Sequence, residues 1–124
     1  MARKNKRQIV HEKFNGKCAY CGCDVLFKDM HIDHIKPKYR GSTDQDLKKY
    51  GIDKGTNDLE NLNPSCASCN SSKSTFTIEN WRKELEMKHQ RLMRDNSSFR
   101  ILSRFGMIKV KKNITFYFEV YGRK

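Results

Sequence analysis

The sequence predicts a small α+β domain whose fold is held together by a bound zinc ion. Two C-x-x-C pairs, "CAYC" and "CASC", have the spacing of the half-sites of a tetrahedral zinc. Apolar residues recur at helical spacing over residues 77–95. Apolar and polar residues alternate over 114–120, which is typical of a β-strand.

Length and composition explain why a zinc staple is expected. The chain has 124 residues, which suits one domain, and only 36% of them are hydrophobic while 32% are charged. A core this thin often needs a metal or a covalent cross-link for stability.

The five cysteines fit a zinc site better than a disulfide framework. Their number is odd and the start of the chain lacks the apolar stretch of a secretion signal, so we expect reduced thiols in the cytoplasm. Gly22 follows the first pair and suits a left-handed turn there, and Asn70 holds the matching place after the second pair. Cys23 is then a spare thiol, and paired free thiols are the alternative to a structural zinc. The expected zinc ligands are Cys18, Cys21, Cys66 and Cys69.

The remaining elements follow in chain order. Residues 6–16 indicate a basic helix, and 24–27 with 30–35 indicate two strands of a hairpin. A polar loop over 36–60 follows, then helices over 77–95 and 97–106 and a C-terminal β-hairpin over 107–122 that turns at Lys112–Asn113. We expect residues 1–76 to form the zinc-bound core with the N-terminal helix, and 77–124 to pack on it.

The charge of the chain indicates a polyanionic partner. The net charge is +12, and Lys and Arg on such a chain commonly neutralise nucleic-acid phosphates. A membrane surface is the rival polyanion, but no long apolar run and no strongly amphipathic basic helix supports it. We therefore expect nucleic acid rather than a membrane.

The stretch "HIDHIKP" places His31, Asp33 and His34 between the two thiol pairs. With "CAYCG" before it and "NDLENLNPSC" and "CNSSK" after it, the order of motifs resembles the HNH endonuclease family over residues 17–73. The resemblance implies a small ββα-metal core, here flanked by helices and the C-terminal hairpin. It also implies cleavage of DNA to 5′-phosphate and 3′-hydroxyl ends.

The resemblance assigns roles residue by residue. Asp33 matches the acidic ligand of the catalytic metal, and Asn70 matches its second protein ligand. His34 matches the general base, Asn61 matches the asparagine that orients it, and Lys73 matches a basic residue near the bound backbone. His31 shares a strand face with Asp33, so it either reaches the metal or a phosphate or is a half-buried structural histidine.

The same chemistry is reasonable without the family. Hydrolysis of a phosphodiester needs an activated water and a cation on the phosphate, and an imidazole exchanges protons near neutral pH. The oxygen ligands of Asp33 and Asn70 favour Mg²⁺ or Mn²⁺. Each residue also has a plainer interpretation: His34 as a structural histidine, Asp33 and Asn61 as turn residues, Asn70 as a cap and Lys73 as a surface lysine.

Two regions depart from the family pattern or lie beyond it. The loop over 39–55 is longer than the short glycine-containing turn usual there, which puts the glycine geometry and the substrate approach in question. In the basic C-terminal part we expect Arg100, Arg104 and Lys109 to contact DNA phosphates, with a charge kept for solubility as the alternative.

The sequence thus predicts a metal-dependent DNA endonuclease. The main alternative is a zinc-containing nucleic-acid-binding module without catalysis, which has no need of the Asp33, His34, Asn61 and Asn70 set. A role as one partner in a larger phage or mobile-element DNA-processing complex is compatible with nuclease activity.

Overall fold

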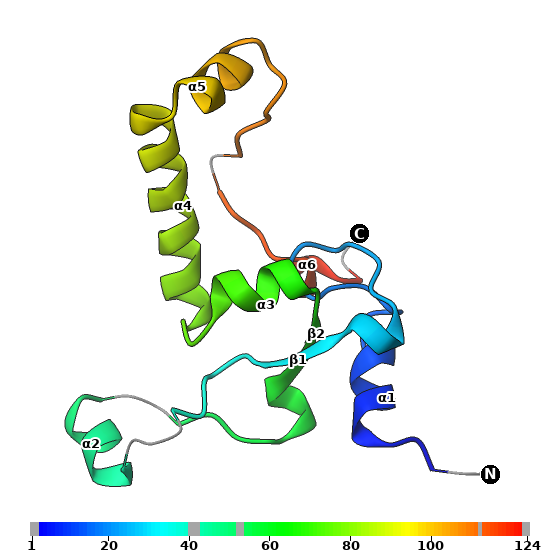
Figure 1. The fold of residues 1–124 in the computed structure, drawn as a ribbon. Helices are drawn as coiled ribbons and strands as arrows, with labels where there is room; N and C mark the ends of the chain where they lie inside the picture. The colour runs from blue at the N-terminus through cyan, green and yellow to red at the C-terminus, as the bar shows by residue number, and fades with distance from the viewer. Residues whose placement is uncertain (1–2, 40–42, 52–53, 112, 123–124) are drawn as a thin grey trace.

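The structure is a computed structural model that describes residues 3–39, 43–51, 54–111 and 113–122. Eight elements follow the chain in this order: α1 (Lys6–Glu12), β1 (His31–His34), α2 (Asp44–Lys49), β2 (Leu62–Ser65), α3 (Ala67–Lys73), α4 (Ile78–Asp95), α5 (Ser97–Arg104) and α6 (Tyr117–Val120). Two 3₁₀ turns, Phe27–Asp29 and Leu59–Asn61, precede the strands. Figure 1 shows the strands at the centre, α4 and α5 extending to one side and α2 to another.

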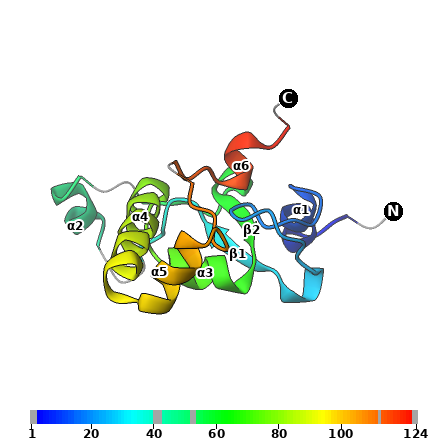
Figure 2. The same ribbon diagram turned by 90° about the horizontal axis from the view of Figure 1, so that it is seen from above.

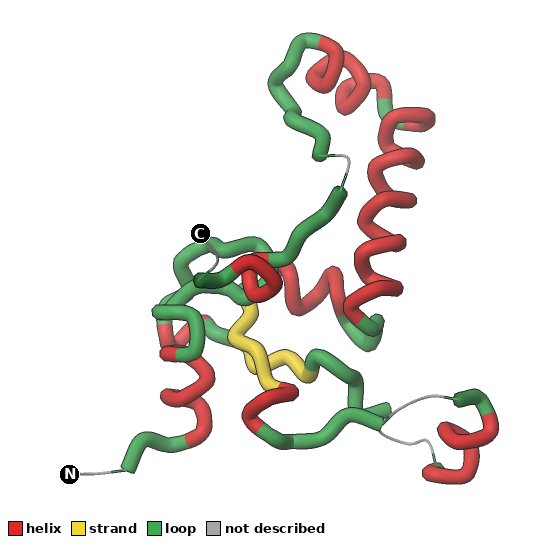
Figure 3. The backbone as a smooth tube through the Cα atoms, turned by 180° about the vertical axis from the view of Figure 1, so that it is seen from behind, coloured by secondary structure: helices red, strands yellow, loops and turns green. Residues whose placement is uncertain are grey.

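The sheet pairs two strands that are far apart in the sequence. β1 runs antiparallel to β2, with Asp33 opposite Asn63 and His34 opposite Leu62. The hairpin predicted between residues 24–27 and 30–35 is therefore wrong. The 3₁₀ turn Phe27–Asp29 takes up the end of the expected first strand, and Leu26 beside it is exposed. Every residue of β2 is buried, so pairing β1 with this strand places β1 against the core. Figure 3 shows the pair in yellow, enclosed by helices and loops.

The two thiol pairs adopt different local structures. Gly22 has φ = +79°, as expected for a left-handed turn after Cys21. Asn70 instead lies within α3, whose N-cap is Cys66, so the left-handed turn predicted there is wrong. The sulfur of Cys66 accepts a hydrogen bond from the backbone N–H of Cys69, which makes this pair a helix start.

The core surrounds the first thiol pair. Val10 of α1, Tyr20 after Cys18 and Trp81 of α4 all belong to one buried cluster. α1 begins with a capping box in which Asn5 and Gln8 bond each other's backbone N–H groups. This cluster connects α1, the segment around Cys18 and α4. Figure 2 shows α1 and α4 on either side of the two strands.

The C-terminal β-hairpin predicted over 107–122 is wrong. Phe116 is buried and stacks on Trp81 with ring centroids 4.6 Å apart, and α6 follows directly. The backbone N–H groups of Tyr117 and Phe118 donate to the carbonyls of Tyr20 and Ala19. The aromatic residues thus pack on the thiol-pair segment and on α4 instead of on a second strand. Lys112, at the predicted turn, lies outside the described residues.

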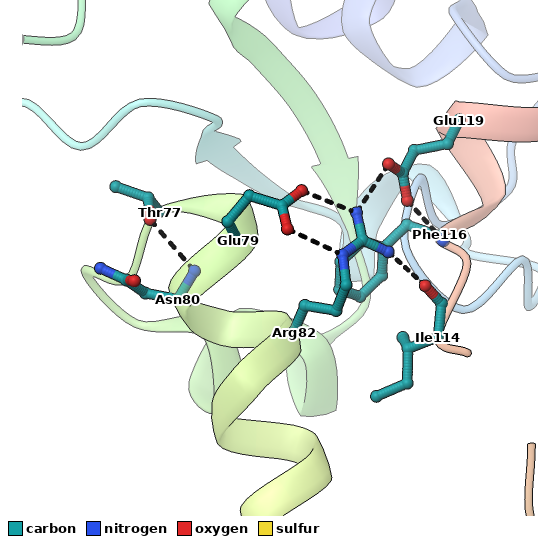
Figure 4. A network of polar contacts seen from close by, with 7 residues as sticks. All are labelled: Thr77, Glu79, Asn80, Arg82, Ile114, Phe116 and Glu119. Carbon is teal, nitrogen blue, oxygen red and sulfur yellow. Dashed lines mark hydrogen bonds and ion pairs between the residues drawn. The ribbon is translucent and has the colours of Figure 1, made fainter. Parts of the chain in front are cut away.

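An arginine on α4 fixes the C-terminal segment in place. The guanidinium of Arg82 donates to Glu119 at 2.7 Å, to Glu79 of its own helix and to the carbonyl of Ile114 (Figure 4). It also lies 4.9 Å from the centroid of the Phe116 ring. These contacts join the base of α4 to α6.

The predicted fold class is confirmed. The chain combines helices with a two-stranded antiparallel sheet, and α3 follows β2 directly, as in a ββα unit. Helix α2, capped by Thr43, lies in the long polar loop, parts of which (40–42 and 52–53) are outside the described residues. Among the helices that the structure describes, none has the length and apolar character needed to cross a membrane.

Candidate active site

Four thiols meet between the sheet and α3. The sulfur atoms of Cys18, Cys21, Cys66 and Cys69 all lie within 4.8 Å of one another. Those of Cys21 and Cys66 are 3.8 Å apart, and four sulfurs at about 2.3 Å from a tetrahedral zinc are separated by roughly this distance. The predicted ligand set is therefore positioned for one metal ion, consistent with zinc.

The electrostatics of this cluster favour a thiolate at Cys18. The thiol of Cys69 and neighbouring backbone N–H groups donate to the sulfur of Cys18, which lowers the pKa of Cys18 to about 4. The same hydrogen bond and burial raise the pKa of Cys69. One thiolate thus forms readily and attracts a cation, which then favours ionisation of the others. Cys23 is exposed, but partial desolvation and a hydrogen bond with the thiol of Cys21 raise its pKa to about 12, so this fifth cysteine stays a thiol.

Three of the predicted catalytic residues line one cavity. Asp33 and His34 at the end of β1 and Asn70 on α3 face a cavity of about 510 Å³, which Lys38 and Tyr39 also line. β1 brings the first two there, because its pairing with β2 places its end beside α3. A carboxylate and an amide oxygen facing one space are the donors that Mg²⁺ or Mn²⁺ takes, so these residues fit the expected metal.

Asp33 is held by two buried partners. The hydroxyl of Tyr20 donates to its Oδ2, and the ammonium of Lys73 lies 3.0 Å from the same oxygen. Lys73 also donates to the backbone carbonyl of His34 at 2.9 Å. Burial and the charge of Asp33 raise the pKa of Tyr20, so its hydroxyl keeps the proton that it donates.

The structure corrects the interpretation of Lys73. This side chain is fully buried, with 0% of its surface exposed, whereas a contact to a DNA backbone requires an accessible ammonium. It compensates the buried charge of Asp33 instead, because an unpaired buried carboxylate is costly. Lys38, which lines the cavity, is the cation that the sequence pattern did not single out.

The contacts of Asn61 also differ from the expectation. Its amide oxygen accepts from the backbone N–H of Lys36, and its amide nitrogen donates to the carbonyls of Lys36 and Thr56. The residue that contacts the imidazole is Asn57, whose Oδ1 lies 2.9 Å from Nε2 of His34. Asn57 lies in the stretch "GTNDLENL", whose second asparagine alone matches the family motif.

The other predicted residues lie outside the cavity. His31 begins β1 opposite Ser65 and is exposed. Arg100 donates to the carbonyls of Met93 and Arg94 at the end of α4, and Arg104 and Lys109 are exposed on the α5 side. Neither His31 nor these cations reach the group formed by Asp33, His34 and Asn70.

Comparisons with known proteins point to the HNH endonucleases. Residues 18–76 match the family model described as HNH endonuclease. The chain is 43% identical over 76 residues to YoqL of Bacillus subtilis, named as an SPbeta prophage-derived HNH endonuclease; the match covers 60% of this chain and 30% of YoqL. It is 32% identical over 78 residues to the CRISPR-associated endonuclease Cas9 of Corynebacterium diphtheriae, covering 62% of this chain and 6% of that protein.

A solved structure shows the same fold. The Type II-C Cas9 enzyme from Actinomyces naeslundii superposes with a TM-score of 0.50 over 82% of this chain and 10% of that one, at 22% identity. The chain therefore spans less than a third of the length of the relatives that it matches.

Proposed function

We propose that this protein is a metal-dependent endonuclease that hydrolyses phosphodiester bonds of DNA, because residues 18–76 match the HNH endonuclease family model. The observation that carries the proposal is the shared cavity of Asp33, His34 and Asn70. A carboxylate, an imidazole and an amide at one cavity match the needs of phosphodiester hydrolysis better than those of simple binding.

Structural zinc is the first part of the proposal. Cys18 and Cys21 would hold it from the first thiol pair, and Cys66 and Cys69 from the start of α3. A closed site of four thiolates has no open position for a substrate, so its role is to hold the fold. It would thereby join the segment that precedes β1 to the start of α3, and β1 and α3 carry the cavity residues.

Asp33 and Asn70 would hold the catalytic Mg²⁺ or Mn²⁺ through their side-chain oxygens. When bound, such a cation supplies positive charge to the phosphate and to the leaving oxygen. The protein's part is to keep these donors fixed. Tyr20 and Lys73 do this for Asp33 by holding its Oδ2, which leaves the other carboxylate oxygen for a ligand.

His34 would act as the general base. It lines the same cavity as Asp33, so a water held there can lie within hydrogen-bond reach of the imidazole and in line with a phosphate. Lys38, at the same cavity, would attract the phosphate without reading the base sequence.

Exposed cations beyond the core would add affinity for the duplex. Arg104 and Lys109 lie on the α5 side of the molecule, and the chain as a whole carries a net charge of +12. Arg100 belongs to this set only in part, because its guanidinium already caps α4. A function inside a phage or mobile-element DNA-processing assembly is consistent with the name of the Bacillus relative.

Supercoiled plasmid is the substrate that tests the proposal. We expect the zinc-loaded protein to convert it to nicked or linear DNA with Mg²⁺ or Mn²⁺ and to leave it intact in EDTA, with 5′-phosphate ends on the products. The alternative, a zinc-containing binding module without catalysis, predicts a gel shift and intact plasmid under every metal condition. Intact plasmid with bound DNA would establish that alternative.

A further inference from the structure

We propose that Asn57, rather than Asn61, is the positioning residue that sets the orientation and tautomer of the His34 imidazole. Its Oδ1 lies 2.9 Å from Nε2 of His34, within ordinary hydrogen-bond distance. This inference deepens the proposed function, since it concerns the general base of the same site. It gives Nε2 of His34 a hydrogen-bond partner that the sequence pattern did not reveal.

The chemistry of the pair determines which nitrogen carries the proton. An amide oxygen can only accept a hydrogen bond, so Nε2 of His34 must be the protonated nitrogen. Nδ1 then keeps its lone pair. In the neutral ring this is the nitrogen that takes a proton from water, and a fixed second nitrogen keeps it aimed at one place.

The backbone just before Asn57 packs against the segment that follows β1. The N–H of Gly55 donates to the carbonyl of Pro37 at 3.0 Å. A Cβ atom at residue 55 would lie 1.7 Å from the carbonyl oxygen of Lys36, so this approach requires glycine. This close approach brings residues 55–57 next to His34.

Two more contacts fix the position of Asn57 itself. Asn61 bridges the carbonyls of Lys36 and Thr56, which joins the strand end to the residue directly before Asn57. On the other side, the ammonium of Lys6 on α1 donates to the carbonyl of Asn57 at 2.7 Å. Asn61 thus has no direct contact with the imidazole in this arrangement; it holds in place the backbone segment that carries Asn57.

Three variants test this assignment by plasmid cleavage. Asn57→Ala removes the acceptor, Asn57→Asp keeps an acceptor oxygen, and Asn80→Ala changes an exposed asparagine of α4 as the matched control. We expect Asn57→Ala to lower kcat about tenfold with little change in KM for DNA or in zinc content, because partners that orient a functional histidine typically contribute this much. Asn57→Asp should recover most of the loss, and Asn80→Ala should cleave as the wild type does.

Nitrogen NMR of the His34 ring gives a readout that does not depend on activity. At a pH where the ring is neutral, the wild type and Asn57→Asp should show one tautomer, with the proton on Nε2, and Asn57→Ala should show both. Equal kcat and equal tautomer populations in the wild type and Asn57→Ala would overturn the assignment, and so would a proton on Nδ1 in the wild type. If the wild type leaves plasmid intact but the tautomer responds as expected, the positioning role stands while the proposed function fails.

Discussion

The core around the four clustered thiols and the α4–α5 arm (residues 78–104) are stabilised in different ways. In the core, four sulfurs from distant parts of the chain meet and a strand is buried along its whole length. In the arm, Trp81 is the one buried residue among those described, and Phe105 just beyond it is 78% exposed. The core therefore depends on long-range contacts, whereas the arm depends on helix caps, on the packing of α5 against α4, and on the contacts of Trp81 and Arg82 at its base.

Removal of the metal should have the largest effect, and it should act on the core rather than on the arm. Structural zinc in small domains contributes about 10–16 kcal/mol of apparent free energy, so chelation should unfold the core and abolish DNA cleavage. Helical circular dichroism should fall only in part if the arm keeps some local helix. A pure, folded sample without zinc would contradict this expectation.

Variants of single cysteines test the same dependence on zinc. Cys66→Ser removes one thiolate ligand while its hydroxyl can still cap α3, so we expect loss of zinc and aggregation from the missing ligand alone. Cys23→Ser is the matched control, because Cys23 is exposed and lies outside the four-sulfur group. Its zinc content and melting temperature should stay close to the wild-type values.

The anchor of the arm should show the next largest effect. Trp81 packs between Tyr20 and Phe116, and replacing a buried Trp with Ala typically costs about 3–5 kcal/mol. Urea unfolding of Trp81→Ala should show this loss while zinc stays bound. Phe105→Ala, at an exposed position, should change the free energy of unfolding by less than about 0.5 kcal/mol.

The smallest expected effect is on DNA affinity, when the exposed cations at and just after the end of α5 are removed. Arg104→Ala with Lys109→Ala should weaken DNA binding for all sequences alike. It should also flatten the slope of log affinity against log salt by about 0.9 for each phosphate that the variant no longer neutralises. Arg100→Ala is the comparison, because its guanidinium caps α4; it should lower stability more than it changes the slope. Identical slopes for the wild type and the double variant would show that these two cations do not contact DNA phosphates.

Much of the core could be predicted because its signals are local. The C-x-x-C spacing identified the four clustered thiols, and Gly22 after Cys21 indicated its left-handed turn. "IDHIKP" and "CNSSK" indicated residues that the fold brings to one cavity, since β1 pairs with β2 and α3 follows β2 directly.

The errors arose where a local pattern had a distant partner. The alternation over 114–120 is a strand pattern, yet its backbone bonds to Tyr20 and its Phe116 ring fills space beside Trp81. Lys73 has the sequence context of a surface lysine, but its partner Asp33 lies far earlier in the chain and is buried. Asn57 and Asn61 share one short stretch, and only the contacts of the folded loop distinguish their roles.

The most direct test of the account is single-turnover DNA cleavage by His34→Ala. The account predicts a variant that binds one zinc, melts near the wild-type temperature and binds DNA with similar affinity, while Mg²⁺-dependent cleavage falls by about 10²–10⁴-fold, as is typical when a general base is removed. Cleavage at the wild-type rate by the folded, zinc-loaded variant would contradict it and would exclude His34 from the chemistry.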